Sequence, residues 1–292
     1  MAPWQAISKA IGQASGEAFT IAERRAVGGG CINEGWWLSD GTRHYFVKLH
    51  GAEGLAMFEA EAAGLHELAG AGAIRVPQPL VWGAEAGRAW LVMEGLALGG
   101  RGSAVQLGQQ LAALHRHSAE RFGWWRDNTI GSSPQANSQH DDWAAFWVAQ
   151  RLQPQRAMAL RRGAGRSLAD GLERLCEALP ALFHDYRPGP SLLHGDLWSG
   201  NYAYTHEGEP VLFDPAVYYG DREADIAMTE LFGGFAADFY AAYREAWPLD
   251  PGYATRKTLY NLYHVLNHYN LFGGGYAQQA EGMVRRLLGE LA

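Results

Sequence analysis

Two acidic residues and an asparagine form the strongest chemical pattern in this sequence. In the segment HGDLWSGN (194–201), Asp196 is followed five positions later by Asn201. Asp214 comes 18 residues after Asp196, at the end of the apolar run VLF. The carboxylate of Asp196 can accept the proton of an attacking hydroxyl group, while an amide oxygen and a second carboxylate can bind Mg²⁺. A single aspartate in a loop is usually a turn residue or a helix cap, so the joint spacing carries the interpretation.

A glycine triplet near the N-terminus could bind phosphate. Gly28, Gly29 and Gly30 lie between two strand-like runs, where backbone amides can approach phosphate oxygens because no Cβ intervenes. A plain hairpin turn would leave the same pattern. The loop is not a Walker motif, since no Gly-Lys-Ser/Thr follows it.

Lys48 is the next candidate along the chain. It is the one amine in the apolar run YFVKL, at a spacing like that of the phosphate-pairing lysine of kinases. Such a lysine needs a carboxylate to hold it, and Glu59 and Glu61 on the following helix are available. We favour Glu61, because Phe58 and Leu65 turn it towards the apolar face. Glycine loop, lysine, glutamate and the Asp-Asn-Asp series together predict a phosphoryl-transfer enzyme.

The hydrophobic pattern predicts an α+β protein that supports these residues. Helices are expected at 4–18 and 52–70, and strands at 19–27, 35–38, 43–49, 76–82 and 88–93. A glycine-rich joint follows at 99–103. The later helices are expected at 103–118, 141–162, 167–185, 222–246, 253–272 and 276–291. We therefore predict a small β-rich N-terminal lobe (1–95) and a larger, mostly helical C-terminal lobe (96–292) that share one cleft.

Composition excludes several classes of protein. The chain has 292 residues, 48% of them hydrophobic, and a formal net charge of −7. An acidic chain with few basic runs argues against binding to nucleic acids or anionic membranes. Two cysteines cannot form a disulfide scaffold and suit a reducing compartment. No signal peptide and no apolar run of roughly 18 residues is present, so we expect a cytoplasmic protein.

These motifs resemble those of the fructosamine kinases, also called ketosamine 3-kinases. This family is a two-lobed branch of the protein-kinase-like fold, related to the aminoglycoside phosphotransferases. The block HGDLWSGN is the most specific part, because aminoglycoside and choline kinases share its His-Gly-Asp and Asn but usually lack the Trp-Ser-Gly. The other similar segments are GGGCINEG (28–35), FVK (46–48), MFEAE (57–61), RVPQP (75–79), DDW (141–143), FDPA (213–216), YYG (218–220), FGGF (232–235) and NH (267–268).

The resemblance implies ATP-dependent phosphorylation of the sugar part of a ketosamine, at its 3-hydroxyl, with Mg²⁺ as cofactor. The phosphorylated adduct is unstable, so the implied role is deglycation. By position, Asp196 would be the base, and Asn201 and Asp214 the Mg²⁺ ligands. Lys48 would contact phosphate, with Glu61 as its ion-pair partner. The segment with Met93, Glu94 and Leu96 would be the hinge that meets adenine through its backbone. The sequence has Asp-Pro-Ala at 214–216 in place of the Asp-Phe-Gly of protein kinases.

Several residues are candidates for substrate binding. Trp198 could form a flat wall for a sugar or an amine, or could be a packed core residue. Asp141 and Asp142 could contact a cationic amine, or could cap the helix that starts near 143. His268 and His264 lie four apart on a predicted helix, which favours a core or substrate-pocket role over a zinc site, because no glutamate accompanies them. The segment FGGF (232–235) is expected to pack helix against helix.

Cys31 lies in the glycine loop, beside amide groups that would lower the pKa of its thiol. We expect its oxidation to inhibit ATP binding, with an intermolecular disulfide as one route. The protein is expected to be a monomer or a weak redox-linked dimer. Cys176, in a helical run, is expected to be structural.

Two other functions fit part of the sequence. A kinase of an aminoglycoside, choline or another small alcohol is disfavoured by the Trp-Ser-Gly stretch. A nucleotide-binding pseudokinase is disfavoured because Lys48, Asp196, Asn201 and Asp214 are all present. The expected partner is a small-molecule ketosamine or a glycated protein, with no nucleic acid and no membrane.

Overall fold

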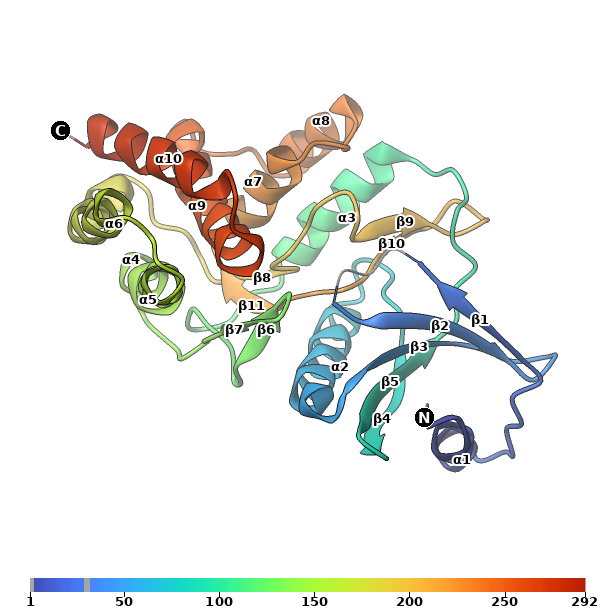
Figure 1. Cartoon of the computed structure of the whole chain (residues 1–292). Helices are drawn as coiled ribbons and strands as arrows, with labels where there is room; N and C mark the ends of the chain where they lie inside the picture. Colours follow the sequence, from blue (N-terminus) through green and yellow to red (C-terminus); the bar gives the residue numbers. More distant parts are fainter. Residues whose placement is uncertain (1–2, 29–31, 292) are drawn as a thin grey trace. The chain divides into compact units, whose positions relative to one another are not determined.

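A five-stranded antiparallel sheet forms the centre of the first of two units of this chain (Figure 1). The computed structural model describes residues 3–28 and 32–291, and the first unit comprises Met1–Ser103 together with Tyr202–Pro215. The strands are β1 (Glu23–Val27), β2 (Glu34–Ser39), β3 (His44–Gly51), β4 (Pro79–Glu85) and β5 (Arg88–Glu94). Their order is β1-β2-β3-β5-β4, and each neighbouring pair is antiparallel.

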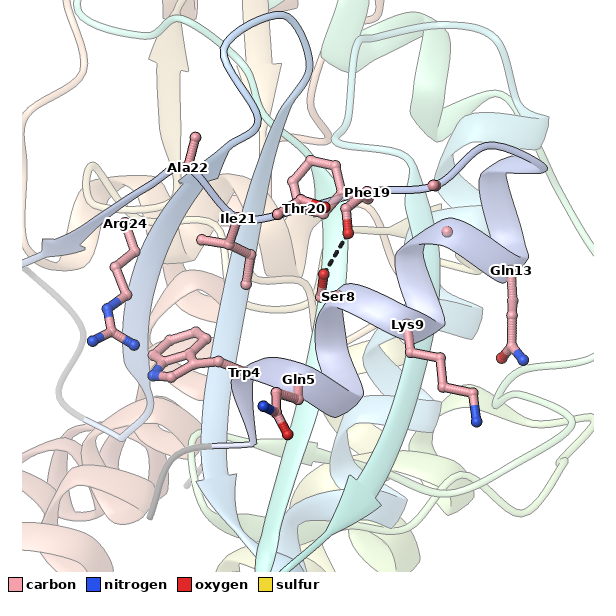
Figure 2. A pocket seen from close by; sticks show the side chains of 12 residues that line it. Trp4, Gln5, Ser8, Lys9, Gln13, Phe19, Thr20, Ile21, Ala22 and Arg24 are labelled. Carbon is pink, nitrogen blue, oxygen red and sulfur yellow. Dashed lines mark hydrogen bonds between the residues drawn. The ribbon is translucent and has the colours of Figure 1, made fainter.

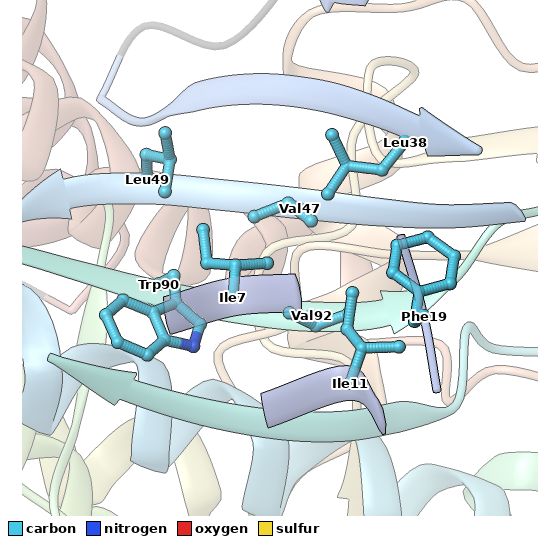
Figure 3. Close-up of a cluster of buried hydrophobic side chains, with 8 residues drawn as sticks. All are labelled: Ile7, Ile11, Phe19, Leu38, Val47, Leu49, Trp90 and Val92. Atoms are coloured by element: carbon cyan, nitrogen blue, oxygen red, sulfur yellow. The ribbon is translucent and has the colours of Figure 1, made fainter. Parts of the chain in front are cut away.

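Two helices cover opposite faces of this sheet, α1 (Trp4–Ser15) and α2 (Leu55–Gly70). Ile7 and Ile11, one helical turn apart, place α1 on an apolar face. The cluster there consists of Ile7, Ile11, Phe19, Leu38, Val47, Leu49, Trp90 and Val92 (Figure 3). Because successive side chains of a strand point to opposite faces, Lys48 on β3 lies on the other face, where it meets Glu61 of α2.

A hairpin from far along the chain also belongs to the first unit. It consists of β9 (Tyr202–Tyr204) and β10 (Pro210–Leu212), which pair antiparallel. The amide of Leu212 donates to the carbonyl oxygen of Arg75 at 3.0 Å. The amide of Gly99 donates to the carbonyl oxygen of Tyr204 at 3.1 Å. These backbone hydrogen bonds attach the segment that leads to Asp214.

An open groove of about 710 Å³ runs along α1 (Figure 2). Its walls are α1 and the extended segment 18–24, which Ser8 joins by donating a hydrogen bond to the carbonyl oxygen of Phe19. None of the residues that the sequence marks for chemistry lines it. The groove is therefore separate from the candidate site.

The second unit, Ala104–Asn201 with Ala216–Ala292, is mainly helical. Its helices are α3 (Ala104–His115), α4 (Trp143–Trp147), α5 (Gln153–Arg161), α6 (Arg166–Ala178), α7 (Glu223–Leu231), α8 (Ala237–Ala246), α9 (Tyr253–Phe272) and α10 (Tyr276–Glu290). Its short strands are β6 (Asn128–Ile130), β7 (Ser133–Gln135), β8 (Ser191–Leu193) and β11 (Tyr218–Gly220). α9 is buried almost continuously from Thr258 to Asn267 and packs against α5, α7 and α10. β8 pairs with β11, and the loop that carries Asp196 leaves the end of β8.

The structure confirms the predicted α+β class and corrects some elements. The strand expected at 19–27 begins at Glu23, and the one expected at 76–82 begins at Pro79. The helix expected over 222–246 is wrong in its middle, because α7 ends at Leu231 and α8 begins at Ala237. Gly233 and Gly234 between them have φ angles of +73° and +95°, which a right-handed helix does not contain. The lobe boundary between residues 95 and 96 stays a prediction.

Within the described ranges 3–28 and 32–291, no helix is both long enough and apolar enough to cross a lipid bilayer.

Candidate active site

Buried Asp225 on α7 holds the start of the loop that carries the predicted base. Its Oδ2 accepts a hydrogen bond from the amide of His194 at 2.7 Å, and its Oδ1 accepts one from the amide of Gly195 at 2.9 Å. Nε2 of His115 lies 3.1 Å from Oδ2. Burial opposes ionisation of this carboxyl, but hydrogen bonds and the charges of His115 and His194 bring the pKa of Asp225 below its ordinary value. The carboxylate therefore fixes the backbone from which Asp196 projects.

Gly195 is required by backbone geometry. Its φ angle is +84°, a left-handed conformation that favours glycine. A Cβ at this position would lie 2.0 Å from the carbonyl oxygen of Ala216. The amide of Ala216 donates to the carbonyl oxygen of His194 at 2.8 Å, so the backbones at these two residues are in direct contact.

Asp196 and Asn201 lie side by side because the loop folds back on itself. Nδ2 of Asn201 donates to the carbonyl oxygen of Asp196 at 2.8 Å. The backbone amide of Asn201 donates to the carbonyl oxygen of Trp198 at 3.0 Å. The side chain of Asp196 is 22% exposed, so an incoming hydroxyl group can reach its carboxylate. The predicted base and one predicted metal ligand thus share one short loop in the second unit.

His264 on α9 is the neighbour of the predicted base. Its Nδ1 lies 4.0 Å from Oδ1 of Asp196. Burial, together with the charge of His268, lowers the pKa of His264 to about 3. The ring is therefore uncharged at neutral pH, and its contact with Asp196 is not an ion pair there. An uncharged neighbour leaves the negative charge of the carboxylate available for accepting a proton.

Lys48, Glu61 and Asp214 meet in the first unit. Lys48 forms an ion pair with Glu61, and its Nζ lies 2.6 Å from Oδ1 of Asp214. The side chains of Lys48 and Glu61 are 9% and 10% exposed, whereas that of Asp214 is 47% exposed. The amine is therefore held between a buried carboxylate and one that faces solvent.

Charge and burial act against each other in this trio. Burial favours the uncharged form of Lys48, but the charges of Asp214 and Glu61 outweigh it and raise the pKa of Lys48 above its ordinary value. For Glu61, burial and the nearby Asp214 raise the pKa, and the Lys48 amine opposes them. The amine is fully charged at neutral pH, as contact with a polyanion requires.

Asp214 has an unusual backbone. Its φ angle is +57°, in the left-handed region that non-glycine residues seldom occupy. Aspartate tolerates this region better than most residues, at a cost of order 1 kcal/mol. The left-handed turn follows β10 directly, where it directs the carboxylate towards Lys48.

The predicted hinge continues β5. Met93 is buried and pairs with Phe46 and Pro79 in the sheet, and the amide of Glu94 donates to the carbonyl oxygen of Gln78 at 2.8 Å. Glu94 also forms an ion pair with Arg75. The backbone amide and the carboxylate of Glu94 therefore both have partners within the first unit. Leu96 lies two residues beyond the end of β5 and is half-buried.

Only part of the predicted phosphate loop lies within the described residues. Gly28 follows β1 and is exposed. Gly29, Gly30 and Cys31 lie outside the described residues, so the predicted roles of the glycine triplet and of Cys31 stay predictions. β2 begins at Glu34, and its Gly35 pairs with Lys48 on β3.

Comparison with known proteins decides the family. The sequence model of the family named fructosamine kinase matches residues 3–290, nearly the whole chain. The chain belongs to the fructosamine kinase family. It is 52% identical over 291 residues to a protein of Synechocystis named probable ketoamine kinase, covering 98% of this chain and 97% of that protein. It is 41% identical over 273 residues to a chloroplastic protein-ribulosamine 3-kinase of Oryza sativa subsp. indica, covering 92% of this chain and 80% of that protein.

Solved structures agree with the family assignment. A candidate fructosamine-3-kinase of Haemophilus somnus superimposes with a TM-score of 0.90 at 29% identity, covering 98% of this chain and 97% of the other. The aminoglycoside phosphotransferase APH(4)-Ia has the same fold, with a TM-score of 0.62 at 16% identity and coverage of 98% and 99%. The predicted resemblance and the protein-kinase-like fold are both confirmed.

The substrate candidates of this fructosamine kinase family member lie in different environments. Trp198 is 39% exposed, so it is not a packed core residue. Asp142 caps α4 by accepting a hydrogen bond from the amide of Ala145 at 2.8 Å, while Asp141 is paired with Arg121 at 2.6 Å. These contacts favour a capping role for Asp142. Roles for these residues in substrate binding stay predictions.

Sequence reasoning missed Asp225, which holds the loop of Asp196, and the buried Glu223 on the same helix. Glu223 forms a bidentate ion pair with Arg256, at 2.8 and 3.1 Å. The signal was the run DREAD (221–225), in which four of five residues are charged and which spans the start of α7. Buried charges at such a position indicate that they hold backbone or pair with one another.

The chemistry of the donor groups fits Mg²⁺. Asn201 and Asp214 would supply an amide oxygen and a carboxylate, the hard ligands that Mg²⁺ prefers. Within residues 3–28 and 32–291, no cluster of three or more His, Cys, Asp and Glu side chains could hold a metal. A cation held by so few protein groups would take its other ligands from water and substrate phosphates, which is usual for Mg²⁺ in phosphotransferases.

Proposed function

We propose that this protein transfers the γ-phosphoryl group of ATP to a hydroxyl group on the sugar part of a ketosamine. The observation that carries the proposal is the trio of Lys48, Glu61 and Asp214, combined with the Asp196–Asn201 loop of the second unit. Family membership and the names of the two relatives support the substrate class. We take the 3-hydroxyl as the acceptor, as the name of the Oryza protein suggests.

Asp196 would act as the base. Its carboxylate accepts the proton as the sugar oxygen forms a bond to the γ-phosphorus and the bond to the bridging oxygen of ADP breaks. Neutral His264 leaves the charge of this carboxylate intact, and Asp225 keeps the loop in place through two backbone hydrogen bonds. The proton would therefore move to a carboxylate whose loop is positioned by the buried Asp225.

Lys48 would contact the phosphates of ATP. Its pairing with Glu61 restricts the direction of a long side chain, so little rotamer freedom is lost when the nucleotide binds. The backbone amide of Leu96 would meet adenine, because the amides of Glu94 and Gly95 already donate to the sheet. Gly28 and the two glycines after it would supply backbone amides to phosphate oxygens.

Asn201 and Asp214 would hold Mg²⁺, which neutralises phosphate charge when it is bound together with ATP. The product, a 3-phosphorylated ketosamine, is unstable in the way that the family resemblance implies, so the role of the reaction would be deglycation. Free amino-acid adducts and glycated proteins both carry the required sugar.

A substrate panel tests the proposal. ADP formation is measured with purified protein, Mg²⁺ and ATP on ribulosyl- and fructosyl-lysine, and on matched alcohols such as kanamycin, hygromycin B and choline. We expect turnover on the ketosamines, with a new phosphate at the 3-position by ³¹P NMR. Turnover on one of the other alcohols and on no ketosamine would show that the proposal is wrong.

A further inference from the structure

The turn between α7 and α8 packs against the catalytic loop. It carries the segment FGGF (232–235), which was expected to pack helix on helix and is instead a loop. A Cβ at Gly234 would lie 2.5 Å from the Cβ of Ser199, and the φ angle of Gly234 is +95°. Glycine at this position therefore lets the turn touch the loop that holds Asp196 and Asn201, and it brings Phe232 close to Trp198.

Five rings from four parts of the second unit form a continuous series. We call Trp198, Phe232, His268, Phe272 and Tyr276 the aromatic wall. Their ring centroids lie 6.4 Å apart for Trp198 and Phe232, 5.1 Å for Phe232 and His268, 5.7 Å for His268 and Phe272, and 5.2 Å for His268 and Tyr276. All five residues belong to one unit, so the series is a property of that unit alone.

The aromatic wall is largely open to solvent. Trp198, Phe232 and Phe272 are 39%, 43% and 56% exposed, and they are among the most exposed large apolar residues of the described chain. Single exposed rings are common on protein surfaces, whereas a contiguous group of them usually marks a binding site. Packing of the fold does not account for such a group, because rings kept for stability are buried.

His268 gives the wall a polar centre with a defined direction. Its Nδ1 lies 2.8 Å from the carbonyl oxygen of His264. A carbonyl oxygen can only accept, so Nδ1 of His268 donates this hydrogen bond and the ring is held in one orientation. The wall therefore presents fixed π faces, which suit an ammonium group carried on hydrocarbon.

The position of the wall determines what part of a substrate it meets. Resting on the function proposed above, the reacting sugar hydroxyl must reach Asp196. Trp198 lies two residues further along the same loop, so the part of the substrate beyond the sugar lies next to the wall. In a ketosamine that part is a secondary amine, which is cationic at neutral pH, and the carbon chain attached to it.

We propose that the aromatic wall is the subsite for the amine-bearing part of the ketosamine, and that it makes the enzyme favour amines with an aromatic or extended apolar substituent. The ammonium group lies over the rings near His268, and the apolar substituent covers Phe232 and Phe272. Amines with a small substituent reach the ammonium position and leave the outer rings uncovered.

Two ketosamines with one sugar test this proposal. The fructose adducts of benzylamine and of methylamine share the reacting hydroxyl and the secondary amine, and they differ in the apolar substituent. We expect the wild type to have a higher kcat/KM for the benzylamine adduct. Phe232→Ala and Phe272→Ala should each lower that value by about three- to tenfold, the size expected for one ring contact. For the methylamine adduct, the change should stay within about twofold.

Leu160→Ala is the matched control. Leu160 is 45% exposed on α5 and belongs to neither the wall nor the catalytic loop, so kcat/KM should stay unchanged for both adducts. Thermal unfolding of all variants checks that each is folded. Equal rates of the wild type on both adducts, or an equal loss on both adducts in the Phe variants, would overturn the wall as a specificity subsite while leaving ketosamine phosphorylation intact. If the wild type phosphorylated neither adduct but did phosphorylate another alcohol, the proposed function itself would fail.

Discussion

The Nζ atom of Lys48 lies 2.6 Å from Oδ1 of Asp214, although 166 positions separate the two residues in the chain. β3 carries the lysine, and the β9–β10 hairpin carries the aspartate to the same unit. The hairpin is attached by backbone hydrogen bonds to Arg75 and Gly99, so the contact depends on backbone geometry as well as on charge. The amine that we propose contacts phosphate and a predicted metal ligand thus adjoin in the first unit.

Replacement of Lys48 by methionine should affect both activity and stability. Loss of the amine should lower kcat/KM for ATP by about 10²-fold or more. Because Glu61 is 10% exposed and would lose its cation, the free energy of unfolding should fall by about 3 kcal/mol. The double variant Lys48→Met/Glu61→Gln removes the buried charge as well, so it should regain stability without activity. Urea denaturation and steady-state kinetics measure the two effects, and an equally stable single variant would contradict the buried ion pair.

Asp196→Asn should keep ATP binding and lose turnover. The backbone carbonyl of residue 196 still accepts from Asn201, so the loop keeps its shape. Loss of the base should lower kcat by about 10²- to 10⁴-fold. Calorimetric titration with ATP and a coupled ADP assay separate binding from turnover. Asp170→Asn, at an exposed position on α6, serves as the control, and full activity of Asp196→Asn would refute its role as base.

Two substitutions at Asp214 separate the effect of its carboxylate on activity from the effect of its left-handed backbone on stability. Asp214→Asn and Asp214→Ala both remove the carboxylate, so both should lose Mg²⁺-dependent turnover. Asparagine adopts a φ angle of +57° at a lower cost than alanine, so the alanine variant should be less stable than the asparagine variant by about 1 kcal/mol. Chemical denaturation of the two variants side by side gives this difference. Equal stability would mean that the left-handed backbone at this residue carries no cost.

His264 should make the wild type sensitive to acid. Burial and the charge of His268 lower the pKa of His264 to about 3, whereas histidine in an unfolded chain has a pKa near 6.5. Between these values the unfolded chain binds a proton that the folded chain does not. This group therefore reduces stability as the pH falls from about 6.5 to 3, by at most about 1.4 kcal/mol per pH unit.

The variant His264→Gln should remove that contribution. Its free energy of unfolding should fall less steeply than that of the wild type between pH 6.5 and 4, even if it is lower overall at neutral pH. Urea titrations at half-unit pH steps compare the two slopes. Parallel slopes would show that folding does not lower the pKa of His264.

Local patterns were enough to predict much of this site. The motif HGDLWSGN predicted that Asp196 and Asn201 lie together, because their close spacing in the sequence keeps them close in space once the loop closes. The apolar spacing around Glu61 correctly favoured it over Glu59 as the partner of Lys48, since a helix turns every fourth residue to the same face.

Longer-range features were not predictable in the same way. The helix expected over 222–246 failed at Gly233 and Gly234, whose φ angles are +73° and +95°. Gly234 also approaches Ser199, which is distant in sequence. Asp225 looked like an ordinary helix charge until the fold placed the amides of His194 and Gly195 against it. The tendency of a residue to be buried does not indicate which backbone amides its side chain will bind.

The sequence by itself determined the family and the phosphotransfer chemistry, because these depend on residue types at short, characteristic spacings. The tertiary structure alone decided that Asp214 joins Lys48 and that Phe232 joins Trp198 and His268. Those contacts depend on hydrogen bonds and on close approaches at glycine between segments far apart in the chain. The free energy of such contacts depends on three-dimensional geometry, which no local pattern of residues contains.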